Sequence, residues 1–192
     1  MNPKPVDRRV RRTKNGLKKG LIQLLRKKSI DTITVKELTD SVDLGRGTFY
    51  FYYHDIYHLL EEIEEEILQD FRHKMNEFSA KELKNKPGPL ILESLLYVSN
   101  NKGIIMLLME MNRGFSEKFN HIIGEKCIND WVILYERNNK EYYEYFKTYV
   151  INGCASIFKH WLTTDMKTPP EEMAQMIEAM IINGIKVLDI TP

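Results

Sequence analysis

Eleven residues from Gly45 to Asp55, GRGTFYFYYHD, hold a high density of groups that can contact a polyanion. Five consecutive residues, 49–53, are aromatic, and Arg46 stands between two glycines just before them. Arginine can donate two parallel hydrogen bonds to a phosphate or to a guanine edge, and a tyrosine hydroxyl can donate to phosphate. A protein core needs some of these rings, so the others need a different partner.

Helical geometry sorts the rings by direction. On a helix that begins near Gly45, Phe49 and Tyr53 are four residues apart and share one face, which we expect to pack into the core. Tyr50 lies about 100° from Phe49, on the same side as Arg46. The spacing predicts that some rings hold a small domain together while others meet DNA.

The elements that position this segment are predicted to be helices. Helical spacing recurs along the chain and no alternation of period two persists, which predicts an all-α fold. A basic first helix is expected over 7–28. Thr34 and Glu37, in TVKE, have the spacing of a capping box in which Glu37 reaches back to the backbone. A short helix then ends near Ser41, and Asp43 can adopt the left-handed conformation of a tight turn, which completes a helix-turn-helix unit.

A long helix is predicted to follow, capped by Asp55. Its apolar stripe is formed by Ile56, Leu59, Leu60, Ile63, Ile67, Phe71, Met75 and Phe78. The acidic run 61–66 is expected on the outer, solvated face. Further helices are expected near 90–100, 103–112, 115–137, 140–165 and 170–189. The predicted domains are a helix-turn-helix DNA-binding domain over 1–54 and a helical regulatory and dimerisation domain over 55–192.

The charge is distributed unevenly along the chain. Residues 1–50 hold 13 Lys/Arg and 5 Asp/Glu, which gives +8, whereas the whole chain carries only +1. Such asymmetry indicates an N-terminal segment with a polyanionic partner. On charge alone, a solvated basic helix, nucleic acid and an anionic membrane surface stay open.

Two stretches resemble a known family. TVKELTDSVDLGRGTFYFYYHDIYHLL resembles the helix-turn-helix signature of TetR-type transcriptional regulators, and the likeness covers roughly residues 8–62. GCASIFKHWLTTDMKTPPEEMAQMI resembles the end of a TetR subgroup that includes a dihydroxyacetone kinase regulator. The resemblance implies a homodimer that regulates transcription by binding a near-palindromic operator in double-stranded DNA. No cofactor is expected.

The resemblance also implies specific DNA contacts. Phosphate contacts are expected from Thr34, Tyr50 and Tyr52, and base or groove contacts from Arg46, Gly47, Thr48 and Phe51. Lys36 joins this set on charge alone. The family usually has a phosphate-contacting lysine where Ile56 stands, and His54 and His58 are the candidates to substitute for it.

The family implies that the last two helices form the dimer and that a small-molecule effector binds in the C-terminal domain. Dimer residues are predicted to be Gly153, Ile157, Trp161, Ile177, Met180, Ile181, Gly184 and Leu188, with an intrachain core as the alternative. Pocket residues are predicted to be Met106, Met109, Phe115, Phe119, Trp131, Tyr135, Tyr142 and Phe146, although such residues are usually core.

Other functions find less support in the sequence. His54 and His58 have the spacing of two metal ligands on one helical face, but no third ligand is evident, so no metal is expected. No phosphate-cradling glycine loop, nucleophile elbow or HExxH motif indicates an enzyme. The two cysteines, Cys127 and Cys154, lack a CxxC spacing and fit a reducing cytoplasm. A helical protein-interaction module or co-regulator without sequence-specific DNA binding remains the main alternative.

Overall fold

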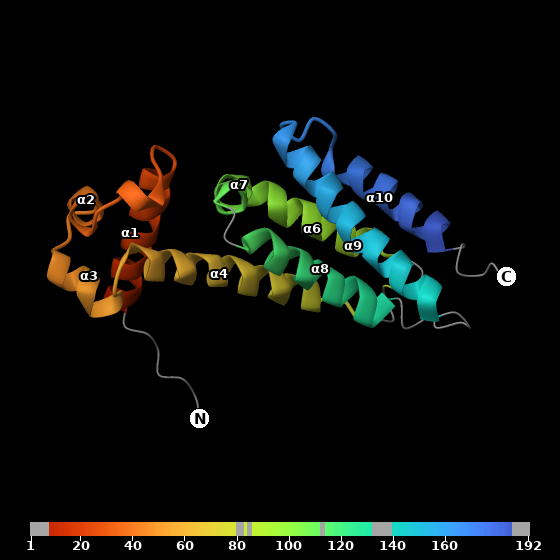
Figure 1. Ribbon diagram of the computed structural model, residues 1–192, viewed down its shortest axis with the longest axis horizontal. Helices are drawn as coiled ribbons and strands as arrows, with labels where there is room; N and C mark the ends of the chain where they lie inside the picture. The colour runs from red at the N-terminus through yellow and green to blue at the C-terminus, as the bar shows by residue number, and fades with distance from the viewer. Residues whose placement is uncertain (1–7, 80–82, 84–85, 112–113, 132–139, 186–192) are drawn as a thin grey trace, which may run out of the picture. The chain divides into compact units, whose positions relative to one another are not determined.

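The computed structural model describes residues 8–79, 83, 86–111, 114–131 and 140–185 (Figure 1). Between residues 126 and 144 it describes no side chains. All regular elements in the described ranges are helices, which confirms the predicted all-α fold. No helix within these ranges is long and apolar enough to cross a membrane.

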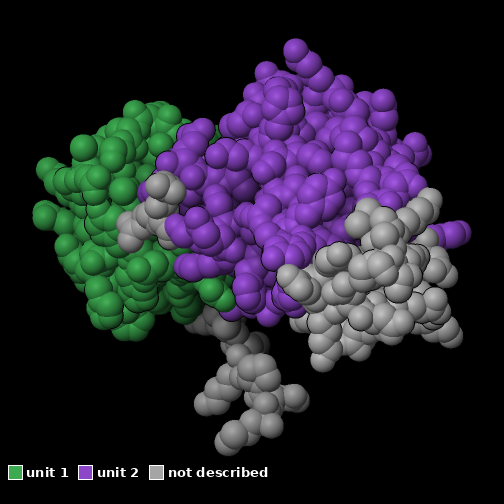
Figure 2. Space-filling view, turned by 45° about the vertical axis from the view of Figure 1, so that its right-hand side comes forward, with its two compact units in different colours: residues 1–67 green, residues 68–192 purple. Residues whose placement is uncertain are grey.

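The chain divides into two compact units, residues 1–67 and 68–192 (Figure 2). The division lies inside a long helix, thirteen residues after the boundary that the sequence suggested between 54 and 55. The cause is that the first turns of this helix pack with the N-terminal unit: Ile56, Leu59, Leu60 and Ile63 are all buried. The functional boundary between residues 54 and 55 stays a prediction.

Unit 1 is built from short helices around a small apolar core. Its elements are α1 (Arg8–Leu25), the 3₁₀ turn η1 (Ile30–Thr32), α2 (Val35–Ser41), α3 (Arg46–Tyr52) and the first part of α4 (Ile56–Asn76). Helix α1 packs on α2, and α2 packs on α3. Leu17 and Leu21 of α1, Leu38 of α2 and Phe49 of α3 are completely buried, so apolar burial holds the three helices together.

Gly20 allows α1 and α2 to approach closely. A Cβ atom at this position would lie 2.6 Å from Cγ1 of Val42 and 3.0 Å from Cδ1 of Leu38. Four residues earlier, a Cβ atom at Gly16 would meet no atom within 4 Å. Helix α1 is therefore in tight contact with the end of α2 at Gly20, whereas the space beside Gly16 is open.

Unit 2 consists of longer helices. Its elements are the end of α4, α6 (Gly88–Asn100), α7 (Lys102–Glu110), α8 (Phe115–Trp131), α9 (Lys140–Thr163) and α10 (Pro170–Ile185). Helix α10 packs against α6 and α9, and α8 packs against α7 and α9 (Figure 1).

Stacked rings form the centre of unit 2. Phe71 of α4 stacks on Phe119 of α8 with ring centroids 4.3 Å apart, and Tyr97 of α6 lies 5.1 Å from Phe71. Cys154 of α9 is also buried, and its burial raises the pKa of the thiol to about 11. The thiol therefore stays protonated and behaves as a small apolar group, as expected from the sequence.

Polar contacts hold the middle of α10 and the turn that precedes it. Glu178 accepts a hydrogen bond from the backbone N–H of Gly88 at 2.9 Å, which supplies a partner for the first turn of α6. In the turn before α10, the indole Nε1 of Trp161 donates to the carbonyl of Thr168 at 2.8 Å. Asp165 and Met166 in this turn have φ of 58° and 52°, the left-handed conformation that ends α9.

The two glycines of α1 give opposite predictions. Gly20→Ala gains helix propensity but crowds Val42, so we expect the free energy of unfolding to fall by about 1 kcal/mol. Gly16→Ala crowds nothing and should raise it by about 0.5–1 kcal/mol. Urea unfolding of both variants measures the contrast. Equal stabilisation by the two substitutions would contradict the close approach at Gly20.

Candidate nucleic-acid interface

The backbone of the helix-turn-helix is fixed by local hydrogen bonds. The Thr34 hydroxyl accepts from the backbone N–H of Glu37 at 3.2 Å and caps α2. The second hydrogen bond of the predicted capping box, from the backbone N–H of Thr34 to the Glu37 carboxylate, is absent from the described residues. The Glu37 carboxylate pairs with Lys28 at 2.5 Å instead. Asp43 has the expected positive φ, 52°, and lets the backbone N–H of Leu44 return to the carbonyl of Thr39.

Helix α3 separates its aromatic rings as predicted. Phe49 and Tyr53 are buried, with 0% and 1% of their surface exposed, and their ring centroids lie 5.6 Å apart. Tyr50 and Phe51 are 57% and 79% exposed, although both are large rings that burial would stabilise. Each exposed ring stands edge-on against a neighbour, Tyr50 on Phe49 and Phe51 on Tyr52. The outward rings are thus held in place without being covered.

The structure brings the predicted DNA-contact residues together in unit 1. Those exposed are Thr34, Lys36, Arg46, Gly47, Tyr50 and Phe51, and those half-buried are Thr48 and Tyr52. They come from the start of α2 and from α3. A Cβ atom at Gly47 would meet nothing within 4 Å, so this position offers open backbone to a ligand. Ile56 is buried and can make no phosphate contact, which agrees with the loss of the usual lysine there.

A cluster of charges joins α1 to α4 within unit 1. Lys18 lies 2.5 Å from carboxylate oxygens of both Glu62 and Glu66, and Lys14 lies 2.7 Å from Glu62. The Tyr53 hydroxyl donates to Glu62 at 3.3 Å, and the Lys14 ammonium lies 5.3 Å from the centre of the Tyr53 ring. The buried ring of Tyr53 anchors the end of α3. The cluster connects this anchor to α1 and α4, the two longer helices of the unit.

The expectation that the acidic run 61–66 is solvated was therefore wrong in part. Glu62 is half-buried in the cluster, and Glu64 is buried. No local pattern in the sequence predicts the partial burial of Glu62, because its partner Lys14 on α1 is 48 residues away. Two lysines that contribute to the N-terminal excess of charge are neutralised inside the unit.

The cluster shifts two protonation equilibria. Partial burial by itself would raise the pKa of Glu62, but hydrogen bonds from Lys14 and Lys18 outweigh it and lower the pKa below its ordinary value. Burial, followed by the negative charge of Glu62, raises the pKa of Tyr53 well above its ordinary value. At neutral pH the carboxylate is thus ionised and the phenol is protonated, as the hydrogen bond between them requires.

His54 and His58 lie side by side at the start of α4. Their rings stack at 5.0 Å, and the backbone N–H of His54 donates to Nδ1 of His58 at 3.3 Å. Asp55 accepts from the backbone N–H of His58 at 2.8 Å and caps the helix as predicted. Among the described residues, no group of three or more His, Cys, Asp or Glu side chains has the arrangement of a metal site.

Among the described residues, the predicted pocket residues lie in different surroundings. Phe115, Phe119 and Phe146 are buried, and the first two belong to the aromatic core. Met106 and Met109 border a cavity of about 90 Å³ together with Lys159 and Leu162. Tyr135 and the side chains of Trp131 and Tyr142 lie outside the described residues. The pocket assignment stays a prediction.

The predicted dimer residues separate into two groups. Trp161, Ile177 and Ile181 are buried within the single chain. Met180 is exposed and Gly153, Ile157 and Gly184 are partly exposed, whereas Leu188 lies outside the described residues. Gly184 is in contact with the ring of Phe146, 3.1 Å from where its Cβ would be. Three members of the predicted set therefore serve the core of this chain.

Comparison with known proteins identifies the family. A TetR model described as a transcriptional regulator C-terminal region matches residues 85–183, more than half of the chain. The chain belongs to the TetR family of transcriptional regulators, which confirms what the helix-turn-helix motif indicated.

Individual relatives are distant. The chain is 23% identical over 171 residues to the uncharacterized HTH-type transcriptional regulator YxbF of Bacillus subtilis (strain 168). That match covers 86% of this chain, but the chain spans only 43% of the relative's length.

Solved structures share the fold. A TetR transcriptional regulator from Streptococcus agalactiae 2603V is similar with a TM-score of 0.69 and 20% identity, over 91% of this chain and 96% of that one. The dihydroxyacetone kinase operon activator DhaS is similar with a TM-score of 0.65 and 18% identity, over 91% and 97%. The fold is thus shared with the subgroup that the C-terminal segment resembles.

The charge cluster predicts a pH dependence of stability. Because the folded pKa of Glu62 is lowered from 4.5, its stabilising contribution is complete above that pH and is lost as pH falls through the folded value. Glu62→Gln should reduce the free energy of unfolding by about 1 kcal/mol at pH 7, since the site is partly exposed.

The difference between wild type and Glu62→Gln should shrink as the pH falls from 7 to below 4.5 and through the folded pKa of Glu62. Urea unfolding across this range measures it, and Glu61→Gln, at an exposed position next to Glu62, is the matched control. Parallel pH profiles for wild type and Glu62→Gln would contradict the role of the cluster.

Proposed function

We propose that this protein regulates transcription as a homodimer that binds a near-palindromic DNA operator through α2 and α3. The observation that supports this best is the sorting of side chains on α3. Phe49 of α3 and Tyr53, directly after the helix, are buried, whereas Arg46, Tyr50 and Phe51 are exposed. A helix that only completed a core would gain from covering Phe51, so its exposure favours an external partner.

Each exposed group matches a feature of duplex DNA. Arg46 is the first residue of α3, where a recognition helix contacts base edges, and its guanidinium fits guanine O6 and N7. Tyr50, Tyr52 and Thr34 carry hydroxyls suited to phosphate, and Phe51 can contact a thymine methyl group. Lys36 adds a cation, whereas Gly47 leaves room for close approach. No step in this role needs catalysis or a cofactor.

Dimerisation is part of the proposal. Tyr145 and Tyr149 of α9 and Met176 and Met180 of α10 are exposed in the single chain. The two helices pack against each other, and a Cβ atom at Gly153 would meet nothing within 4 Å. Two copies joined by these faces would form a four-helix bundle. Two-fold symmetry would place two α3 helices about 34 Å apart for successive major grooves.

We assign control by a small-molecule effector to unit 2. The two cysteines lack a CxxC spacing, which favours action in a reducing cytoplasm. The cavity beside Met106 and Met109 is about 90 Å³, whereas pockets for small molecules occupy about 300–1,000 Å³. A small-molecule effector in this unit would need more space than that cavity offers. It would act by favouring one of two conformations with different affinity for DNA.

Selection of bound fragments from a random DNA pool tests the proposal. We expect a two-fold-symmetric motif whose binding weakens steeply as salt rises, because Lys and Arg contacts release counterions. Arg46→Ala should lose about 10- to 100-fold of discrimination between the best site and its variants. Tyr50→Phe should weaken all sites to a similar extent.

Arg26→Ala is the charge-matched control, because Arg26 is exposed and lies beyond the end of α1. It should leave the selected motif unchanged. If no motif emerges while the protein still captures a protein partner after Arg46→Ala, the helical interaction module is the better description. If Arg46→Ala does not change binding to the best operator, the assignment of α3 as the base-contacting helix is wrong.

The dimer face gives a separate prediction. Met180→Glu places a charge on a side chain that is 46% exposed in the single chain, so each protomer should stay folded. Two charges brought together at the two-fold axis should shift the protein from dimer to monomer in sedimentation velocity. Asn76→Glu adds the same charge at the exposed end of α4 and should leave the dimer intact. A dimer unaffected by Met180→Glu would place the interface elsewhere.

A further inference from the structure

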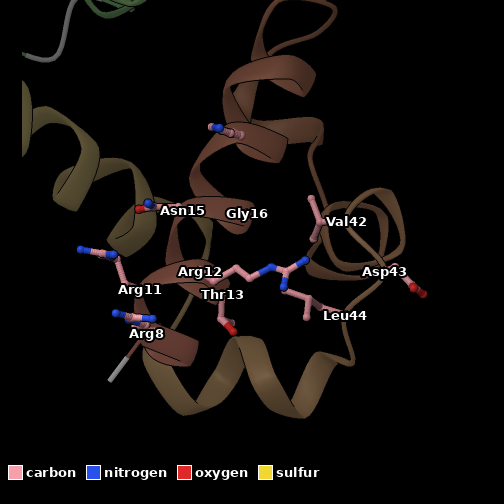
Figure 3. Close-up of a pocket in the computed structure, with 10 residues that line it drawn as sticks. Arg8, Arg11, Arg12, Thr13, Asn15, Gly16, Val42, Asp43 and Leu44 are labelled. Carbon is pink, nitrogen blue, oxygen red and sulfur yellow. The ribbon is translucent and has the colours of Figure 1, made fainter. Parts of the chain in front are cut away.

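A wide hollow opens between the first half of α1 and the turn that joins α2 to α3 (Figure 3). Its volume is about 790 Å³, and Arg8, Arg12, Lys19, Val42 and Asp43 are among the residues that line it. The spacing of the two walls is set by glycines. Helix α1 is in close contact with Val42 and Leu38 at Gly20, and the space beside Gly16, which lines the hollow, is open.

The cations of α1 are sorted between two surroundings. Lys14 and Lys18 are neutralised by Glu62 and Glu66 of α4. In contrast, Arg8, Arg11, Arg12 and Lys19 border the hollow and are exposed, and none has an ion pair with any residue that the structure describes. The hollow therefore collects four cations whose charge is not compensated within the described part of the unit.

The opposite wall adds little negative charge. Asp43 is the one carboxylate among the lining residues, and its side chain points away from Arg12 (Figure 3). Arg12 reaches from α1 toward Val42 and Leu44 and so crosses the space between the walls (Figure 3). Thr13 and Asn15 supply further polar groups on the α1 side. Arg11 points to the opposite side from Arg12 (Figure 3), whereas Arg8, Arg12 and Lys19 follow one face of α1 and can donate to neighbouring phosphate oxygens.

We propose that this hollow is a binding site for a chain of phosphate groups, such as the polyphosphate of a free nucleotide. The hollow is large enough for a ligand of that size, and arginine provides the bidentate geometry that phosphate accepts. The sugar-phosphate backbone of DNA beside the operator offers the same chemistry. A ligand here would contact α1 and the turn before α3 together, which separates this site from the base-contacting face of α3.

Binding of inorganic tripolyphosphate to the full chain, without DNA, is the first experiment. Calorimetry at moderate salt should detect one site, and Arg12→Gln and Arg8→Gln should each weaken it about tenfold. Arg26→Gln removes the same charge outside the hollow and should change the affinity less than about twofold. This experiment does not depend on the proposed DNA-binding function.

A second variant separates occupation of the hollow from general charge. Gly16→Leu adds a side chain where a Cβ meets no atom within 4 Å, and leucine favours the helix. We expect its unfolding temperature to be no lower than that of wild type, and its tripolyphosphate binding to be weakened at least as much as by Arg12→Gln. A folded Gly16→Leu protein that binds tripolyphosphate like wild type would overturn the proposal.

Duplex DNA distinguishes the two sources of phosphate, and this arm rests on the proposed function. If tripolyphosphate does not bind but Arg12→Gln weakens duplex binding about tenfold more than Arg26→Gln, the site takes phosphates of DNA. If Arg12→Gln and Arg26→Gln have equal effects with both ligands, the charge acts diffusely and no site exists. Loss of duplex binding alone, with tripolyphosphate still bound, would count against the DNA proposal and leave this site in place.

Discussion

Helix α3 depends on two rings for its place in unit 1. It spans seven residues, and a helix of fewer than about 12 residues is not stable alone in water. Burial of Phe49 and Tyr53 supplies the missing stability, and it also fixes the rotation of the helix. Because residues four apart share a face, the same burial forces Arg46 and Tyr50 outward. One packing interaction thus determines both that α3 exists and what it displays.

The anchor is itself held by charge. Tyr53 donates to Glu62, and Glu62 also receives Lys14 and Lys18 from α1. A partly buried carboxylate is costly unless it is paired, and here three donors surround it. The arrangement uses two of the cations of α1 for structure and leaves the others at the surface. The N-terminal charge of +8 is therefore an upper limit on what a polyanion can encounter.

Local features of the fold could be predicted from the sequence, and long-range ones could not. The helices, the Thr34 and Asp55 caps and the positive φ of Asp43 follow from residues within four positions of each other. The division of rings on α3 follows from helical periodicity for the same reason. Burial of Glu62 depends on how α1 meets α4, and the hollow depends on where α1 diverges from the α2–α3 turn. Neither leaves a periodic signal in the chain.

The C-terminal helices show a second limit of pattern reading. Helix α10 is apolar on more than one side, so its sequence cannot say which side meets its own chain. The structure resolves this: Ile177 and Ile181 face the core, and Met176 and Met180 stay outside. Trp161 is likewise retained within the chain, because its indole nitrogen is satisfied by Thr168. An interface with a second copy would be formed by side chains that the core of the single chain does not bury. Methionine and tyrosine suit such an interface, because their side chains can be exposed to water or packed against another protein surface.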